Sequence, residues 1–195
     1  MTRDILTAFR PAIVLTIAFS LLLGIAYPLA LTGIGQWLFP RQANGSLIVA
    51  DGRPIGSALI GQGFESDRYF ASRPSAAGKG YDGLASSGSN LGPAAQALAD
   101  RVRGDVAKLE ATGAGAPPVD LVTASASGLD PDISPSAADY QVARVAKARG
   151  LPEAVVRQLV ARAVERPALP FLGEAHVNVL ALNLALDRLN AGARE

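Results

Sequence analysis

The sequence predicts an α+β protein in which a single N-terminal transmembrane helix is followed by one small α+β soluble domain. Three observations support this fold class. A long uncharged apolar segment lies near the N-terminus, short apolar runs between turn signals follow it, and helical periodicity marks the second half of the 195-residue chain. We therefore divide the chain into an N-terminal tail with a membrane anchor, residues 1–40, and a soluble α+β domain, residues 41–195.

The anchor is predicted from residues 11–40, which include no Asp, Glu, Lys, Arg or His. A membrane-spanning helix needs about 20 predominantly apolar residues, and we expect it at about residues 11–34. Tyr27, Trp37 and Phe39 near its distal end are typical of a membrane interface. The run is about twice as long as the 7–15 apolar residues of a signal peptide, which favours an uncleaved anchor in the lipid bilayer. Two basic residues flank the span on each side, so charge does not distinguish its orientation.

Charge and cysteine content exclude several kinds of partner and site. The segment after the anchor has equal numbers of basic and acidic residues, and the whole chain has a formal net charge of +1 and no cysteine. A neutral domain lacks the basic surface that binds phosphates, so we expect no nucleic-acid partner. Without cysteine the chain has no disulfide scaffold, no thiolate metal site and no catalytic thiol.

The first part of the soluble domain is predicted to be a small β-hairpin and a long loop. Apolar runs at 47–50 and 55–60 are bounded by turn signals at 44–45 and 51–52, which indicates a hairpin. Residues 62–93 are rich in Gly and Ser and have no clear period. A loop longer than about 12–15 residues inside a domain is usually functional or disordered. Aromatic side chains argue against disorder and predict an ordered, irregular binding surface; they are Phe64, Tyr69, Phe70 and Tyr81.

Four soluble helices are predicted from apolar spacing and capping residues. The first begins near Pro93, with Ser89 or Asn90 as its cap, and ends in the flexible break at 112–118. Its apolar stripe consists of Leu98, Val102, Val106 and Leu109.

The second helix opens with Ser134-Pro135 as N-cap and first turn, runs through Arg149 and stops at Gly150. Pro152 opens the third helix, whose apolar side comprises Val155, Val156, Leu159, Val160 and Ala163. The fourth begins near Asn178, with an apolar stripe of Val179, Leu182, Leu186 and Leu189.

Catalytic motifs are weak in this chain. The Gly-Lys pair at 78–79 precedes a glycine, so the hydroxyl residue of a P-loop is missing. Ser125 or Ser127 could combine with His176 and Asp187 into a Ser-His-Asp arrangement, but neither serine lies in a Gly-x-Ser-x-Gly turn. A membrane-tethered serine hydrolase using Ser125 or Ser127 with His176 is therefore the alternative function.

A group of carboxylates offers a second candidate site: Asp120, Asp130, Asp132 and Asp139. Such oxygens could bind a hard cation, but the spacing of a calcium loop is missing. An Asx turn at residues 130–132 before the Ser134 helix is the favoured interpretation, and we expect no bound metal. Arg68 and Arg73 could pair with these carboxylates as a structural network.

Several of these segments resemble the C subunit of Kdp-type potassium-transporting ATPases. The most specific match is residues 120–135, DLVTASASGLDPDISP, and residues 59–62, 69–76, 81–82, 89–93 and 177–187 add shorter ones. The chain departs at 173–176, where it reads Gly-Glu-Ala-His and the family often has Gly-Glu-Pro-Arg; this argues against an essential role for His176. The resemblance implies a set of partner-binding or structural residues: Phe64, Tyr69, Phe70, Arg73, Pro74, Ser75, Tyr81, Asp82, Ser89, Asn90, Ser125, Asp130 and Asp132.

The resemblance also implies a function. It describes a non-catalytic accessory subunit that assembles and stabilises an ATP-driven potassium uptake complex in the bacterial inner membrane. The implied partners are a catalytic P-type subunit, a potassium-channel-like subunit and a small membrane subunit. The subunit would act as a catalytic chaperone that raises the ATP affinity of the catalytic subunit, with Gln62 and Gly61 contacting an ATP shared with that subunit. The resemblance also places the soluble domain in the periplasm, from where coupling to cytoplasmic ATP would run through the membrane subunits as a population shift.

Overall fold

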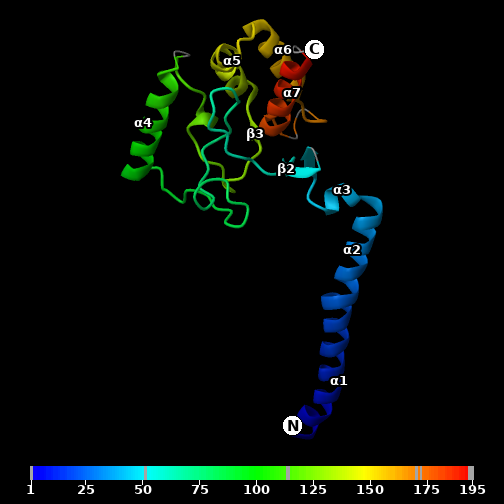
Figure 1. The fold of residues 1–195 in the computed structure, drawn as a ribbon. Helices are drawn as coiled ribbons and strands as arrows, with labels where there is room; N and C mark the ends of the chain where they lie inside the picture. The colour runs from blue at the N-terminus through cyan, green and yellow to red at the C-terminus, as the bar shows by residue number, and fades with distance from the viewer. Residues whose placement is uncertain (1, 51, 113–114, 170, 172, 193–195) are drawn as a thin grey trace. The chain divides into compact units, whose positions relative to one another are not determined.

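The computed structural model describes residues 2–50, 52–112, 115–169, 171 and 173–192 (Figure 1). The chain forms two compact units, Met1–Leu47 and Ile48–Glu195.

The first unit is dominated by one long apolar helix, as the sequence predicts. It comprises α1 (Thr2–Leu21), a π-helical turn η1 (Leu22–Ala26) and α2 (Tyr27–Leu38). The part from Thr7 to Leu38 is long and apolar enough to cross a membrane, and its most apolar window includes no buried residue among those the structure describes. The helix extends beyond the expected residues 11–34 at both ends. The widened turn precedes Pro28, which lacks the N–H that would bind the Gly24 carbonyl in an α-helix.

A tight turn ends this unit. The short helix α3 (Pro40–Ala43) is followed by Asn44, whose side-chain amide donates to the Pro40 carbonyl at 2.6 Å and to Gln36 Oε1 at 3.0 Å. Gly45 has φ +83°, which glycine adopts without strain. The predicted turn at 44–45 is confirmed.

The predicted hairpin is confirmed as a two-stranded sheet of β1 (Leu47–Ala50) and β2 (Arg53–Ser57). The second strand begins and ends earlier than the apolar run at 55–60. Residues 58–60 instead form a turn, in which the Ile60 amide donates to the Ser57 carbonyl at 3.4 Å.

Four longer helices follow, in agreement with the prediction: α4 (Gln96–Glu110), α5 (Pro135–Arg149), α6 (Glu153–Ala163) and α7 (Val179–Gly192). Ser134 caps α5, because its Oγ accepts the Ala137 amide at 3.0 Å, and Gly150 ends that helix at φ +67°. Asn178 caps α7 in the same way, through the Ala181 amide at 3.0 Å.

Some details of the helix predictions are wrong. Helix α4 begins at Gln96 rather than at Pro93, and Ala95 occupies the cap position without a side-chain hydrogen bond. Ser89 and Asn90 therefore do not cap it, because a turn joining the Ala95 amide to the Gly92 carbonyl precedes the helix. Two residues of the predicted apolar stripes are exposed, namely Val155 in α6 and Leu189 in α7.

A second sheet was not predicted from the sequence. It has three antiparallel strands in the order β3 (Asp132–Ile133), β5 (His176–Asn178) and β4 (Val164–Glu165). Ile133 and Val164 both lie opposite Val177 in the central strand. Strands of two or three residues are too short to show an alternating pattern, so only the packing of distant segments reveals them.

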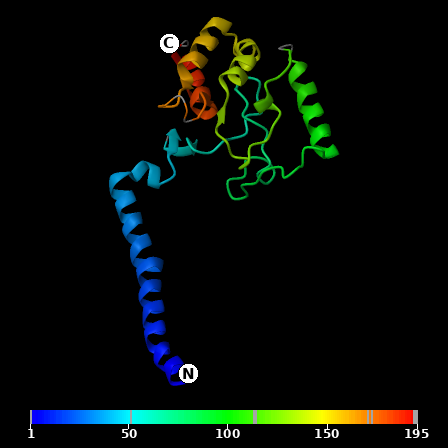
Figure 2. The ribbon, with the colours of Figure 1, turned by 180° about the vertical axis from the view of Figure 1, so that it is seen from behind.

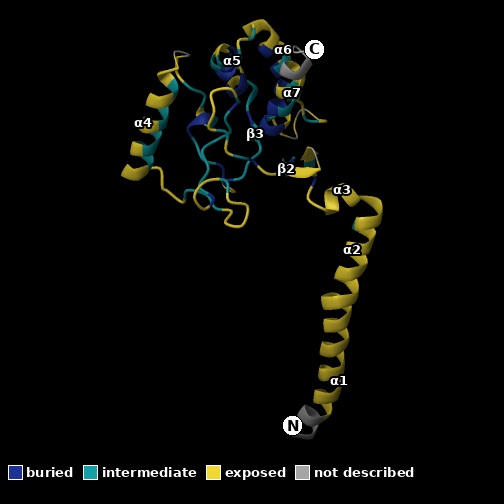
Figure 3. Ribbon diagram, viewed as in Figure 1, coloured by how far each residue is buried: buried dark blue, intermediate teal, exposed yellow. Residues whose placement is uncertain are grey.

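The core lies between this small sheet and helices α5, α6 and α7, which gather in both views (Figures 1 and 2). Its buried side chains are mostly aliphatic, and α5 and α7 both include buried stretches (Figure 3). One aromatic residue of the core, Phe70, comes from the irregular loop and is completely buried. The 3₁₀ turn η2 (Val119–Leu121) contributes Leu121 to the same core.

Candidate functional site

Residues predicted from distant parts of the sequence meet in a shallow polar cleft of about 460 Å³. Its lining consists of Leu59, Arg73, Ala124, Ser125, Ala126, Ser127, Leu129, Asp130 and Pro131. The guanidinium of Arg73 forms an ion pair with Asp130 Oδ2 at 2.9 Å, and both side chains are a little over one quarter exposed. Arg73 Nε also donates to the Thr123 carbonyl at 3.4 Å. The predicted pairing of Arg73 with a carboxylate is therefore confirmed.

Two glycines allow the loop to lie directly against the 120–132 segment. The Gly61 amide donates to the Leu129 carbonyl at 2.8 Å, and a Cβ on Gly61 would lie 2.4 Å from the Asp130 carbonyl oxygen. Gly128 has φ +67°, and a Cβ there would lie 2.6 Å from both the Ala77 nitrogen and the Ser87 oxygen. The two segments thus touch through their backbones, and the Gly61 N–H is already bound within the protein.

Ser75, Tyr81 and Asp82 hold the loop in its shape. Ser75 Oγ donates to the Gly128 carbonyl at 2.6 Å and accepts the Tyr81 amide at 2.8 Å. The Tyr81 hydroxyl donates to the carbonyl of Arg73, and burial raises the pKa of this phenol. Asp82 Oδ1 accepts the Leu84 amide at 2.9 Å. These three residues therefore organise the backbone that positions Arg73.

Two buried amide side chains clamp the loop from the helices, and the sequence analysis missed both. Asn183 of α7 accepts the Phe70 amide at 2.8 Å and donates to the Phe70 carbonyl at 3.0 Å. Gln141 of α5 does the same for Ala71, at 2.7 and 3.1 Å. Each side chain replaces a neighbouring strand, so the loop backbone is satisfied in the core without belonging to a sheet. The only sequence signal was a polar residue inside an apolar helix pattern.

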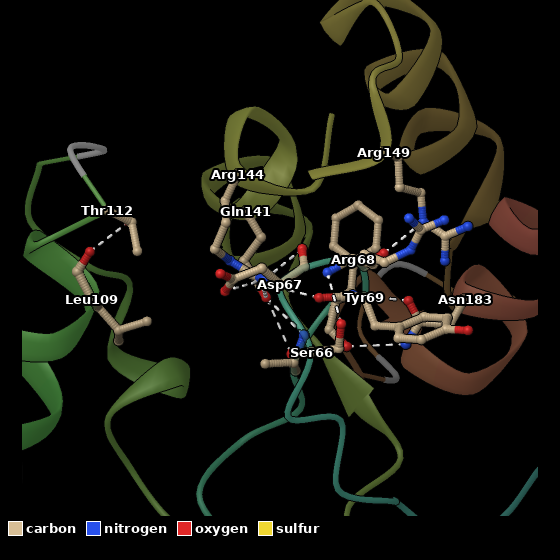
Figure 4. A network of polar contacts seen from close by, with 12 residues as sticks. Ser66, Asp67, Arg68, Tyr69, Leu109, Thr112, Gln141, Arg144, Arg149 and Asn183 are labelled. Carbon is tan, nitrogen blue, oxygen red and sulfur yellow. Dashed lines mark hydrogen bonds and ion pairs between the residues drawn. The ribbon is translucent and has the colours of Figure 1, made fainter. Parts of the chain in front are cut away.

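Two arginines of α5 extend this clamp along the loop (Figure 4). Arg144 donates to the Tyr69 carbonyl at 3.0 Å and to the Asp67 carbonyl at 2.9 Å. Arg149 donates to the Arg68 carbonyl at 2.6 Å, and its guanidinium carbon lies 4.8 Å from the centre of the Tyr69 ring. The predicted pairing of the Arg68 side chain with the carboxylates near 130 is not present. Arg68 contributes its carbonyl oxygen to Arg149 instead, because its backbone faces α5.

The remaining predicted loop residues lie around this framework. Gln62 is half-buried, its amide close to Gly56, and its carbonyl accepts Ser72 Oγ at 3.2 Å. Phe64 stacks at a tilt against Tyr69, with 5.6 Å between ring centres. The half-buried residues Pro74 and Ser89 and the exposed Asn90, at φ +53°, complete the set.

The Asx turn at Asp130 is confirmed, because Asp130 Oδ1 accepts the Asp132 amide at 3.1 Å. Asp132 Oδ1 in turn accepts the Asn178 side-chain amide at 3.1 Å, and burial raises the pKa of Asp132. His176 Nε2 lies 3.8 Å from Asp132 Oδ2 and 3.9 Å from Glu165 Oε2. The carboxylates of Asp132 and Glu165 therefore both lie close to His176, in the central strand of the second sheet.

The contacts of the described residues do not assemble the proposed Ser-His-Asp arrangement. His176 faces Asp132 and Glu165, whereas Asp187 binds Arg149 at 2.8 Å and Tyr69 at 3.2 Å. Ser125 Oγ lies 3.5 Å from Ser127 Oγ, which accepts the Leu129 amide at 3.1 Å. The serine, the histidine and the aspartate each have other partners.

Comparison with known proteins agrees with the resemblance noted in the sequence. The family model of KdpC, the K⁺-transporting ATPase c chain, matches residues 9–188. A protein of Polaromonas naphthalenivorans named Potassium-transporting ATPase KdpC subunit is 60% identical over 184 residues, covering 92% of this chain and 94% of that protein. A protein of the same name from Bradyrhizobium diazoefficiens is 57% identical over 204 residues, covering 98% of this chain and all of that protein. A third, from Caulobacter vibrioides, is 57% identical over 184 residues, covering 93% of each chain.

Proposed function

The chain belongs to the KdpC family and is an accessory subunit of a potassium-transporting ATPase, and from this premise we propose that it assembles and stabilises the pump complex. Its partners in the proposal are the catalytic P-type subunit, the potassium-channel-like subunit and the small membrane subunit. The chain itself contributes no catalytic step. The complex lies in the bacterial inner membrane, with the soluble domain of this chain in the periplasm.

The observation that carries this proposal is the exposure of the apolar helix. The described residues of the helix from Thr7 to Leu38 are exposed along almost its whole length. An apolar surface of this length belongs in a bilayer, where partner helices can bind it. The soluble domain supports the same interpretation, because the charged groups of its cleft are paired with each other rather than arranged around a reacting atom.

The polar cleft is the surface we assign to a partner subunit. The Arg73–Asp130 ion pair and the hydrogen bond from Gly61 to Leu129 hold together the two segments that form the cleft. Its rim includes the exposed side chains of Leu59 and Ala126. A shallow, preformed surface of this kind suits a protein partner better than it encloses a small substrate.

Blocking the cleft tests its role in assembly. Ala126→Arg adds a long cationic side chain at the rim and removes no hydrogen bond of the described residues, so we expect it to reduce recovery of the partner subunits at least about fivefold. The measurement is affinity purification of the tagged chain in mild detergent, with potassium-stimulated ATP hydrolysis of the eluate. Ala143→Arg on the exposed side of α5 is the matched control, for which recovery stays at the wild-type level. Equal recovery for both variants would rule out the cleft as the contact.

We further propose that the subunit raises the ATP affinity of the catalytic subunit through the complex, as a shift between conformations of the pump. The Gly61 amide is already bound to Leu129, which favours this route over direct contact with ATP. Omitting the chain should then raise the KM for ATP. Gln62→Ala should leave that KM within about twofold of wild type.

Direct contact predicts a different result for Gln62. A raised KM in Gln62→Ala but not in Gln96→Ala, which removes an exposed amide from α4, would favour an ATP molecule shared with the catalytic subunit. Labelling of this chain by a photoreactive ATP analogue in the intact complex would support the same conclusion.

A further inference from the structure

The hairpin that follows the apolar helix has an unusually exposed apolar surface. Leu47, Val49 and Ile55 are 54%, 60% and 40% exposed, although all three lie in the paired strands β1 and β2. A two-stranded sheet gains little stability in water unless another surface covers one of its faces. Only the end of β2, at Ser57, is buried. Leu47, Val49 and Ile55 therefore lack the cover that the half-buried Ile48 and Gly56 have.

Chain connectivity indicates what covers them. Leu47 comes only nine positions after Leu38, the last residue of the apolar helix. The connection is held short, because Asn44 binds back to Gln36 at 3.0 Å and the Ser46 amide donates to the Arg41 carbonyl at 2.9 Å. A hairpin that starts there begins close to the depth at which the span leaves the hydrocarbon.

The residues before the hairpin have the composition of a membrane interface. Trp37 is 80% exposed and Phe39 57% exposed at the end of the apolar helix. Aromatic side chains of this kind are enriched at the level of the lipid headgroups. Arg41 and Arg53 are also exposed, and within the described part of the chain no ion pair involves either of them. Exposed arginines at this level favour the phosphates of anionic lipids.

We propose that the β1–β2 hairpin is a second membrane contact, in which Leu47, Val49 and Ile55 enter the headgroup region of the bilayer. Arg41, which precedes the hairpin in the chain, and Arg53 within it bind lipid phosphates. The lipid surface fits better than a protein partner, because these exposed apolar side chains follow the aromatic end of the span by only a few residues in the chain.

The chain offers a clean test, because it contains no cysteine. A single cysteine at Val49 is labelled with an environment-sensitive fluorophore, and the full chain is reconstituted into phosphatidylcholine–phosphatidylglycerol vesicles containing lipids spin-labelled near the headgroup. Val119→Cys is the matched control, since this valine is 72% exposed in η2. We expect a blue-shifted emission at position 49 and quenching at least about twice that at position 119.

Ile55→Cys provides a second labelled position if Val49→Cys lowers the yield of folded chain. Weaker quenching after Arg53→Gln in anionic vesicles, with no change in pure phosphatidylcholine, would support the phosphate contact. Equal quenching at positions 49 and 119 would overturn the proposal. A label at position 49 that the lipids quench in the chain alone but not in the assembled complex would identify a partner subunit as the occupant and would also overturn it.

Discussion

The irregular loop and helix α4 reverse the usual relation between regular structure and burial. Helix α4 has 15 residues, helical hydrogen bonds and the predicted apolar stripe, yet none of its residues is buried. The loop of residues 62–93 includes no helix or strand, yet Phe70 and Ala77 in it are completely inaccessible. The comparison shows that regular secondary structure does not identify the part of this domain on which the rest depends.

The physical reason is the way in which the backbone N–H and C=O groups of each segment find hydrogen-bond partners. Helix α4 binds its own amides, so it needs the domain only for its half-buried side chains. The loop has no such internal ladder, and Gln141, Asn183 and Arg144 supply the missing bonds from two helices. A buried backbone that depends on a few side chains is sensitive to each of them, because an unpaired buried group costs about 1–3 kcal/mol.

The largest expected effect is that of Gly128→Ala, which removes the close approach of the loop. The new methyl group would lie 2.6 Å from two backbone atoms, at a φ of +67° that alanine adopts only with strain. We expect the free energy of unfolding to fall by about 4 kcal/mol, from left-handed strain together with overpacking. Chemical denaturation of the full chain in detergent, followed by circular dichroism, measures it. A loss below about 1 kcal/mol would show that the two segments can separate freely.

Asn183→Leu tests the clamp with a side chain of similar size. It leaves the Phe70 N–H and carbonyl without partners in the core, and we expect a loss of about 3 kcal/mol. Gln96→Leu on α4 removes an exposed amide and should change stability by less than about 0.5 kcal/mol. Equal stability of the two variants would show that the loop does not depend on the Asn183 hydrogen bonds more than α4 depends on its exposed Gln96.

Gly104→Ala makes the opposite prediction for α4. This glycine lies inside the helix, and nothing within 4 Å would meet an added Cβ. Alanine has the higher helix propensity and restricts the unfolded chain, so we expect stability to rise by about 0.5–1 kcal/mol. The same Gly→Ala change would thus destabilise the protein at Gly128 and stabilise it at Gly104. A loss of stability at Gly104 would mean that α4 packs against a surface absent from the isolated chain.

The smallest expected effect is the pH dependence that Asp132 contributes to the stability of the protein. Burial raises the pKa of Asp132 above its usual 3.8, so the folded state holds this proton more tightly than the unfolded state. Ionisation of Asp132 at higher pH therefore lowers the free energy of unfolding, and Asp132→Asn removes that contribution. We expect the stability of the variant relative to wild type to increase as the pH rises from below 3.8 toward neutrality. Thermal melts of both proteins across this range measure it, and the reverse trend would contradict the burial of this carboxyl.

Local chemistry in the sequence predicts much of this molecule. The uncharged run at 11–40 predicts the long apolar helix, the Ser134-Pro135 and Gly150 signals predict both ends of α5, and the Asx turn at Asp130 needs only neighbouring residues. These features depend on contacts within a few positions of the chain. They can therefore be predicted without knowledge of the fold.

The way the loop is held and the pairing of its charges depend on long-range packing. The clamp joins Phe70 to Asn183 across 113 positions, and Arg73 meets Asp130 across 57. The strands of the second sheet are too short to have a period, and His176 faces carboxylates from the other two strands. Composition and spacing carry no information about such pairings, because the free energy that selects them arises when distant segments are buried together. Local sequence patterns thus predict the apolar helix, the soluble helices and the family, whereas burial against α5 and α7 gives the candidate site its form.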